Sequence, residues 1–170
     1  MCEVVEARVR SAEPADVPAV HRMILELAEY ERLRDEVRAT EADLREALFG
    51  PRPVVEAAVA EEAGEAVGFV LFFANYSTFV GRPGLYVEDL YVRPAWRGRG
   101  HGRRLMEHVI RLARERGCGR VEWAVLVWNE PAIRFYRAVG ARPLEDWRLW
   151  RLTAEAIERY PAPATPAAPP

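Results

Sequence analysis

Lysine is missing from this sequence of 170 residues, so its 24 basic side chains are all arginines. Modification of its own lysine side chains is thereby excluded. Metal ligands are scarce as well, because Cys2, Cys118, His21, His101 and His108 show no spacing that brings three or four ligands together. We therefore predict no metal site.

Long apolar segments are missing too. The longest apolar run, near Val67 to Ala74, is far shorter than the roughly 20 residues that span a bilayer. The first residues, Met1 to Glu6, lack the basic and apolar parts of a secretory signal. Two thiols without such a leader indicate a reducing compartment. We expect a cytoplasmic protein without a membrane partner.

The length and the 50% share of hydrophobic residues suffice for one buried core but not for two. We expect an N-terminal leader over residues 1–6 and one domain over residues 7–160. The tail over residues 161–170 contains only Pro, Ala and one Thr. We expect this tail to be disordered, because it cannot bury enough apolar surface to offset its ordering entropy.

Charge is distributed unevenly, although the net charge is only −2. Residues 22–46 are rich in Glu and Asp, whereas residues 93–116 are rich in Arg. The first region suits a cation and the second an anion. A slightly negative protein without a wider basic face is not expected to bind nucleic acid.

The hydrophobic pattern predicts an α/β fold, with a mixed sheet and helices on both faces. Strands and helices alternate after an antiparallel start, and Gly or Pro marks most boundaries. The expected strands are 7–10, 54–60, 66–76, 85–92, 120–127 and 147–152. Four helices are expected, beginning near Pro14, Thr40, Arg103 and Pro131. The first carries Tyr30 and Glu31 near its end, and the other three end at Gly50, Gly117 and Gly140 in that order.

A glycine-rich segment, residues 97–102, follows the strand over residues 85–92 and opens a helix. The first turn of a helix leaves N–H groups unpaired and carries partial positive charge, so it attracts phosphates. Gly98, Gly100 and Gly102 allow a phosphate to approach those amides, and the arginines around them add attraction. This loop lacks the ending of a nucleotide-binding P-loop and fits the dinucleotide spacing poorly.

Glu88 and Asp89 lie inside an apolar strand, where an unpaired carboxylate is costly to bury. They either pair with structural arginines or face a cationic amine. Neighbouring residues of a strand point to opposite faces, so both carboxylates reach one pocket only if the strand contains a bulge.

Tyr136 lies within the helix that follows Pro131. On pattern alone, a core tyrosine is the more common interpretation. Asn129 stands where a side chain caps the start of that helix.

Several separated motifs resemble the GNAT superfamily of N-acyltransferases. Arg97, Gly100 and Gly102 match the Arg/Gln-x-x-Gly-x-Gly/Ala loop that binds the pyrophosphate of acyl-CoA in this superfamily. The segments 27–31, 86–92, 128–131, 135–136 and 140–141 look like the diamine and thialysine N-acetyltransferase branch. The similarity extends from about residue 7 to residue 152.

This resemblance implies a mostly antiparallel sheet with a splayed strand pair, acetyl-CoA as cosubstrate, and a small-molecule amine as acceptor. It also implies a homodimer, which the Trp-rich end of the chain (Trp147, Trp150) favours. Tyr136 would protonate the departing thiolate, and Glu88 would take a proton from the amine, directly or through a water. The implied cofactor-binding residues are Leu90, Tyr91, Val92, Arg97, Gly98, Arg99, Gly100, His101, Gly102, Arg103, Asn129 and Pro131, and the implied substrate-binding residues are Tyr30, Glu31, Glu88, Asp89 and Glu145.

Ser77-Thr78-Phe79 differs from the acidic-Pro-Trp stretch of spermidine-type enzymes and resembles the Ser-Thr-Trp of the thialysine type. The chain also lacks a Ser-His-Asp or Cys-His arrangement for covalent catalysis, so direct transfer in a ternary complex is expected. The alternatives are a non-catalytic acyl-CoA-binding regulator and an enzyme that acetylates protein amino groups.

Overall fold

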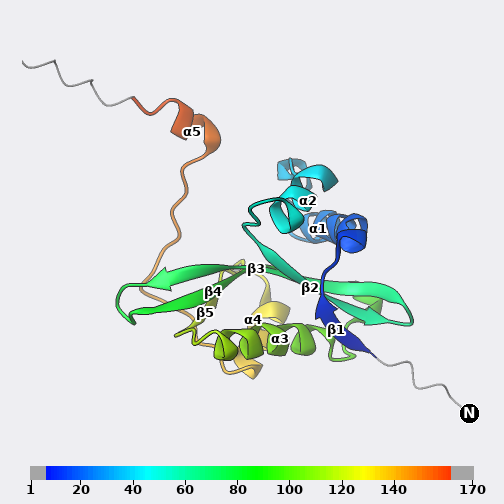
Figure 1. Ribbon diagram of the computed structural model, residues 1–170. Helices are drawn as coiled ribbons and strands as arrows, with labels where there is room; N and C mark the ends of the chain where they lie inside the picture. The colour runs from blue at the N-terminus through cyan, green and yellow to red at the C-terminus, as the bar shows by residue number, and fades with distance from the viewer. Residues whose placement is uncertain (1–6, 162–170) are drawn as a thin grey trace, which may run out of the picture.

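The computed structural model describes residues 7–161, and the leader and nearly all of the predicted tail lie outside them. A single five-stranded sheet with the order β1-β2-β3-β4-β5 organises the chain (Figure 1). The first four strands are antiparallel neighbours, whereas β4 and β5 run parallel. The strands are β1 (Arg8–Ser11), β2 (Glu56–Glu62), β3 (Glu65–Ser77), β4 (Arg82–Val92) and β5 (Val121–Trp123).

Helices cover both faces of this sheet, as the sequence predicts (Figure 1). Helices α1 and α2 pack on one face around a core that contains Met23 and Phe69. Helix α3 packs on the other face around Phe72 and Leu105, and α4 lies on the same side. The helices are α1 (Val17–Tyr30), α2 (Glu41–Phe49), α3 (His101–Glu115), α4 (Glu130–Ala138) and α5 (Ala154–Glu158), and short 3-10 turns cover Pro14–Asp16, Arg34–Glu36 and Pro94–Trp96.

Local signals set several boundaries as predicted. Thr40 caps α2 by accepting a hydrogen bond from the Asp43 amide at 3.2 Å, and the Asp43 side chain accepts one from the Thr40 amide in return. Gly117 follows α3 with φ of 66°, a conformation that glycine adopts without strain.

The central strand β4 contains the predicted bulge. Asp89 pairs with Leu71 and Val87 with Phe72, so Glu88 has no partner on β3. On the other side, β4 pairs with β5 only from Leu85 to Val87 and continues to Val92 without it. The bulge and the end of the β4–β5 pairing therefore coincide, and the two strands separate there, as expected of the splayed pair.

Several predicted strand boundaries need correction. Strands β2 and β3 extend further toward each other than predicted, because Ala63 and Gly64 alone form the turn with positive φ values. Strand β4 begins at Arg82 rather than Leu85. Strand β5 is the short segment Val121–Trp123 instead of residues 120–127, because beyond Trp123 no strand within residues 7–161 pairs with it and Val127 is 88% exposed.

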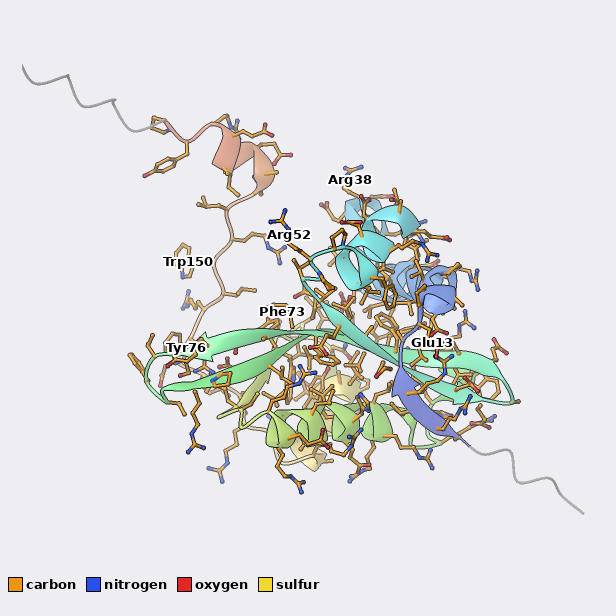
Figure 2. The ribbon with its side chains drawn as sticks, in the orientation of Figure 1. Glu13, Arg38, Arg52, Phe73, Tyr76 and Trp150 are labelled. Carbon is orange, nitrogen blue, oxygen red and sulfur yellow. The ribbon has the colours of Figure 1, made fainter. Side chains whose placement is uncertain are left out.

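The predicted final strand over residues 147–152 is wrong for the single chain. Residues 141–161, which we call the C-terminal arm, extend away from the sheet and contain only α5. Trp147 is 72% and Trp150 is 89% exposed, and Figure 2 shows Trp150 pointing away from the sheet. A strand forms only where a neighbouring strand supplies hydrogen bonds, and no described strand lies beside the arm. No helix among residues 7–161 is long and apolar enough to cross a membrane.

Candidate active site

The glycine loop forms an open anion-binding end on α3. Gly98 and Gly100 have φ values of 77° and 86°, and no side chain caps the first turn of α3. A Cβ atom built on Gly98 would meet nothing within 4 Å. The first amides of a helix have no intrahelical partner. The loop therefore offers unpaired N–H groups and open space, which fit a pyrophosphate.

Gly102 has a different role from the other two glycines. A Cβ atom there would make an ordinary contact with the Phe135 ring at 3.8 Å, so α3 lies directly against α4 at this position. The loop is therefore close to α4, the helix over Glu130–Ala138 that carries Tyr136.

Arg97 is fixed in place by the strand before it. Its Nε donates a hydrogen bond to the Val92 carbonyl oxygen at 2.9 Å. Its guanidinium carbon lies 5.2 Å from the Tyr30 ring centre and 5.5 Å from that of Tyr91. Such cation–π contacts hold the positive charge beside the loop. Arg103, in contrast, has a 57% exposed side chain beside Glu107.

His101 is the first residue of α3, and its side chain points behind the loop. The ring is only 1% exposed and its Nε2 lies 2.7 Å from Glu62 on β2. Any contact of this residue with a phosphate therefore comes from its main chain. Arg99 reaches the same glutamate at 3.2 Å.

Glu31, Asp89 and Tyr136 form a second cluster, where α1 ends beside the bulge of β4. Burial, together with the charges of Glu88 and Glu31, raises the pKa of Asp89 to about 6. Burial, together with Glu31 and Asp89, raises the pKa of Tyr136 to about 12. Burial also raises the pKa of Glu31. All three side chains are partly buried, and the shifts have the direction expected of neighbouring groups in a region of negative charge, which suits a cation.

Glu88 is exposed, because the bulge releases it from the β3 ladder. Its charge contributes, after burial, to a raised pKa of the neighbouring Tyr86. Tyr86 stacks on Phe73 of β3 with ring centres 5.3 Å apart. The structure thus places Glu88 at the solvent side of the cluster and Asp89 inside it.

Tyr30, at the end of α1, contacts the residues that begin α4. Its hydroxyl donates a hydrogen bond to Asn129 Oδ1 at 3.1 Å, and the same oxygen accepts one from the Ala132 amide at 3.3 Å as the cap of α4. The Tyr30 ring also lies 5.9 Å from that of Trp128. Tyr30 therefore connects α1 to the start of α4, across the place where β4 and β5 separate.

The other predicted site residues have different surroundings. The side chains of Leu90 and Val92 pack in the core beside α3, and Tyr91 packs in the core beside α1. Beyond Val87 their main chains face a side of β4 that no described strand covers. Glu145 lies on the exposed arm, in a turn closed by a hydrogen bond from the Trp147 amide to Leu144.

Sequence reasoning missed two neighbours of the site. Trp123 stacks on Tyr136 with ring centres 4.8 Å apart, and Glu62 holds His101 from a different strand. Neither residue is part of a motif, and each reaches the site only because a helix packs against its strand. The glycine loop offers a place for an anion, and the carboxylates beside Tyr136 offer a place for a cation.

Comparison with known proteins shows the family of the chain. The sequence matches the acetyltransferase (GNAT) family over residues 18–141. It is 40% identical to the thialysine N-epsilon-acetyltransferase of Sus scrofa, covering 88% of this chain and 94% of that protein. It is 33% identical to the L-ornithine N5-acetyltransferase of Arabidopsis thaliana, covering 89% and 86%.

Solved structures show the same fold. An integron cassette protein from the mobile metagenome of V. cholerae superposes with a TM-score of 0.74 at 24% identity, covering 89% of this chain and 95% of that chain. An aminoglycoside acetyltransferase from an uncultured soil metagenomic sample, in complex with sisomicin, superposes with a TM-score of 0.71 at 17% identity, covering 86% and 97%.

Proposed function

Since this chain belongs to the GNAT acetyltransferase family and is an N-acetyltransferase, we propose that it transfers the acetyl group of acetyl-CoA directly to a primary amine of a small molecule. The observation that carries this proposal is the Glu31, Asp89 and Tyr136 cluster at the opening between β4 and β5, beside an uncapped helix end. An amine-binding region and an anion-binding region thus adjoin one gap in the sheet.

The residues present fit acetyl-CoA, which supplies an activated thioester when bound. The open amides at Gly98 and Gly100 suit its pyrophosphate, with Arg97, Arg99 and Arg103 around them. The uncovered edge of β4 at Leu90 to Val92 suits the amides of its pantetheine arm. We propose that four further residues contact the cofactor through their main chains or by packing against it: His101, Gly102, Asn129 and Pro131.

The carboxylates would prepare the amine. An alkylammonium group has a pKa of about 10.4 and attacks nothing until it loses a proton. We assign Glu31 and Asp89, with Tyr30 beside them, to holding the cation. Glu88 is exposed and can pass the proton to water, which keeps it as the base. Asp89, with its pKa near 6, is the second candidate for that role.

Tyr136 would act on the leaving group. Its raised pKa keeps the phenol protonated at neutral pH, so it has a proton to donate to a thiolate. Part of that rise comes from Glu31 and Asp89. A bound ammonium group would offset both negative charges, lower the pKa of Tyr136 and make proton donation easier exactly when the acceptor is present.

The relatives point to amines that carry a second charged group, because thialysine and ornithine are amino acids with a side-chain amine. Ser77-Thr78-Phe79 in place of an acidic stretch favours this class over polyamines. Glu145 on the arm is proposed as a further substrate contact. Release of free CoA thiol from acetyl-CoA in the presence of a primary amine tests the assignment.

We also propose a homodimer, because the C-terminal arm exposes more apolar surface than a soluble monomer normally leaves in one segment. Leu144, Trp147, Leu149, Trp150 and Leu152 are all more than 60% exposed on this arm. Light scattering should give twice the chain mass of 19.3 kDa. Trp147→Ser combined with Trp150→Ser should shift the protein toward monomer, whereas a wild-type monomer at micromolar concentration would contradict the proposal.

A further inference from the structure

The hairpin between β2 and β3 carries three glutamates that each bind arginines from other elements. Glu61 binds Arg8 at 2.8 Å and Arg10 at 2.9 Å on β1. Glu65 binds Arg93 at the end of β4 at 2.8 Å. Glu62 differs from both, because its partners belong to the glycine loop.

Glu62 makes two contacts with that loop. One carboxylate oxygen lies 2.7 Å from His101 Nε2 and the other lies 3.2 Å from Arg99 Nη1. The Glu62 side chain is only 16% exposed and the His101 ring is 1% exposed. Hydrogen bonds to a charged group in such surroundings are about twice as strong as neutral ones.

Trp96 packs against both partners of Glu62. The Trp96 ring lies edge-on to His101 with ring centres 6.4 Å apart. The Arg99 guanidinium carbon lies 4.7 Å from the Trp96 ring centre. His101 Nδ1 is buried without a hydrogen-bond partner among the described residues, so Glu62 is the group that holds this ring.

We propose that Glu62 is a positioning residue for acetyl-CoA, which rests on the function proposed above. It fixes His101 and Arg99 on either side of Gly100 and thereby holds the loop amides in their binding orientation. Glycine-rich backbone loses much conformational freedom when it is ordered. A loop that Glu62 has already ordered loses less freedom on binding, so the cofactor binds more tightly.

Glu62→Ala should therefore weaken CoA binding, measured by calorimetry, by roughly tenfold. Glu62→Gln still accepts a hydrogen bond from His101 but carries no charge, so its affinity should lie between those of wild type and Glu62→Ala. In the acetylation assay, the KM for acetyl-CoA should rise in parallel, whereas kcat at saturating acetyl-CoA should stay within about twofold, because Glu62 touches no reacting atom.

Glu61→Gln is the matched control. It removes a similar ion-paired charge from the neighbouring residue of the same hairpin, but its partners are on β1. It should lower the melting temperature without changing the Kd for CoA. Melting temperatures measured for all variants show how far each substitution lowers the stability of the fold. A fall in CoA affinity that exceeds the one seen for a control of similar melting temperature then reports a loss of loop order.

The outcomes separate this inference from the function on which it rests. If wild type binds CoA and acetylates an amine, but Glu62→Ala binds CoA equally well, the role of Glu62 is refuted and the proposed function stands. If Glu61→Gln weakens binding as much as Glu62→Ala does, the hairpin acts only as a general support and the inference is also refuted. If wild type binds no CoA, both proposals are wrong.

Discussion

Tyr136→Phe should lower kcat by roughly 10²-fold to 10⁴-fold, the range usual for loss of a general acid. The substitution removes one hydroxyl and keeps the ring that stacks on Trp123 at 4.8 Å and on Phe135 at 5.3 Å. The fold and the binding of acetyl-CoA should therefore change little. Steady-state kinetics with a saturating amine, together with calorimetry of CoA binding, measures both quantities.

Tyr86→Phe provides the control for this experiment. Tyr86 is also half-buried, also lies near the carboxylates, and also has a raised pKa, but it packs on Phe73 of β3 instead of Trp123. Its loss should leave kcat within a few-fold. Wild-type turnover by Tyr136→Phe, where chemistry limits the rate, would return Tyr136 to the role of a packing residue.

Asp89→Asn should have opposite effects on activity and stability. The ionised Asp89 carboxylate is proposed to hold the ammonium group of the acceptor, so activity should fall by roughly 10²-fold through loss of a charge-assisted contact. The raised pKa of about 6 means that folding ionised Asp89 costs free energy at neutral pH. The variant should therefore be more stable than wild type at pH 7.5, by up to about 3 kcal/mol.

The pH dependence follows from the same shift. Asp89 has a pKa of about 6 in the folded chain and about 3.9 when unfolded. Protonated Asp89 favours the folded state below pH 4, and this contribution is lost as the pH rises through 6. The stability advantage of Asp89→Asn should accordingly disappear between pH 6 and pH 4. Equal stability of the two proteins at pH 7.5 would contradict the buried environment.

Glu88→Gln distinguishes the two carboxylates. Glu88 is exposed, so this variant should show no comparable gain in stability. Because Glu88 is the proposed base, the variant should lose most activity at neutral pH, where the amine arrives protonated. Part of this activity should return as the pH rises toward the amine pKa. An unchanged pH profile would transfer the role of base to Asp89.

The bulge in β4 was expected from the family resemblance, because the sequence alone indicated only that Glu88 and Asp89 would share one face if the strand were bulged. The glycines before α3 favoured an anion site, but a glycine-rich loop alone is weak evidence, because glycines are also common in turns. In both places the family motif made the interpretation specific. The family resemblance then linked the two distant segments into one site.

The C-terminal arm shows the limit of this reasoning. Residues 147–152 have the composition of a strand, but a strand also needs a neighbour, and sequence does not say whether one exists. The same limit applies to Glu62, which looks like a surface hairpin residue and is joined to His101 only through the pairing of β2 with the rest of the sheet. Contacts between elements distant in sequence carry no local signal.

The most direct test of direct acetyl transfer to a small amine is thiol release from acetyl-CoA with a panel of amines: thialysine, ornithine, lysine, putrescine, spermidine and a short peptide with a free amino group. We predict saturable release with at least one small primary amine, one CoA for each N-acetylated product identified by mass, and no acetyl group retained on the protein when the amine is omitted. Tight CoA binding without thiol release for any amine would identify an acyl-CoA-binding regulator instead, and release with the peptide alone would move the substrate to protein amino groups.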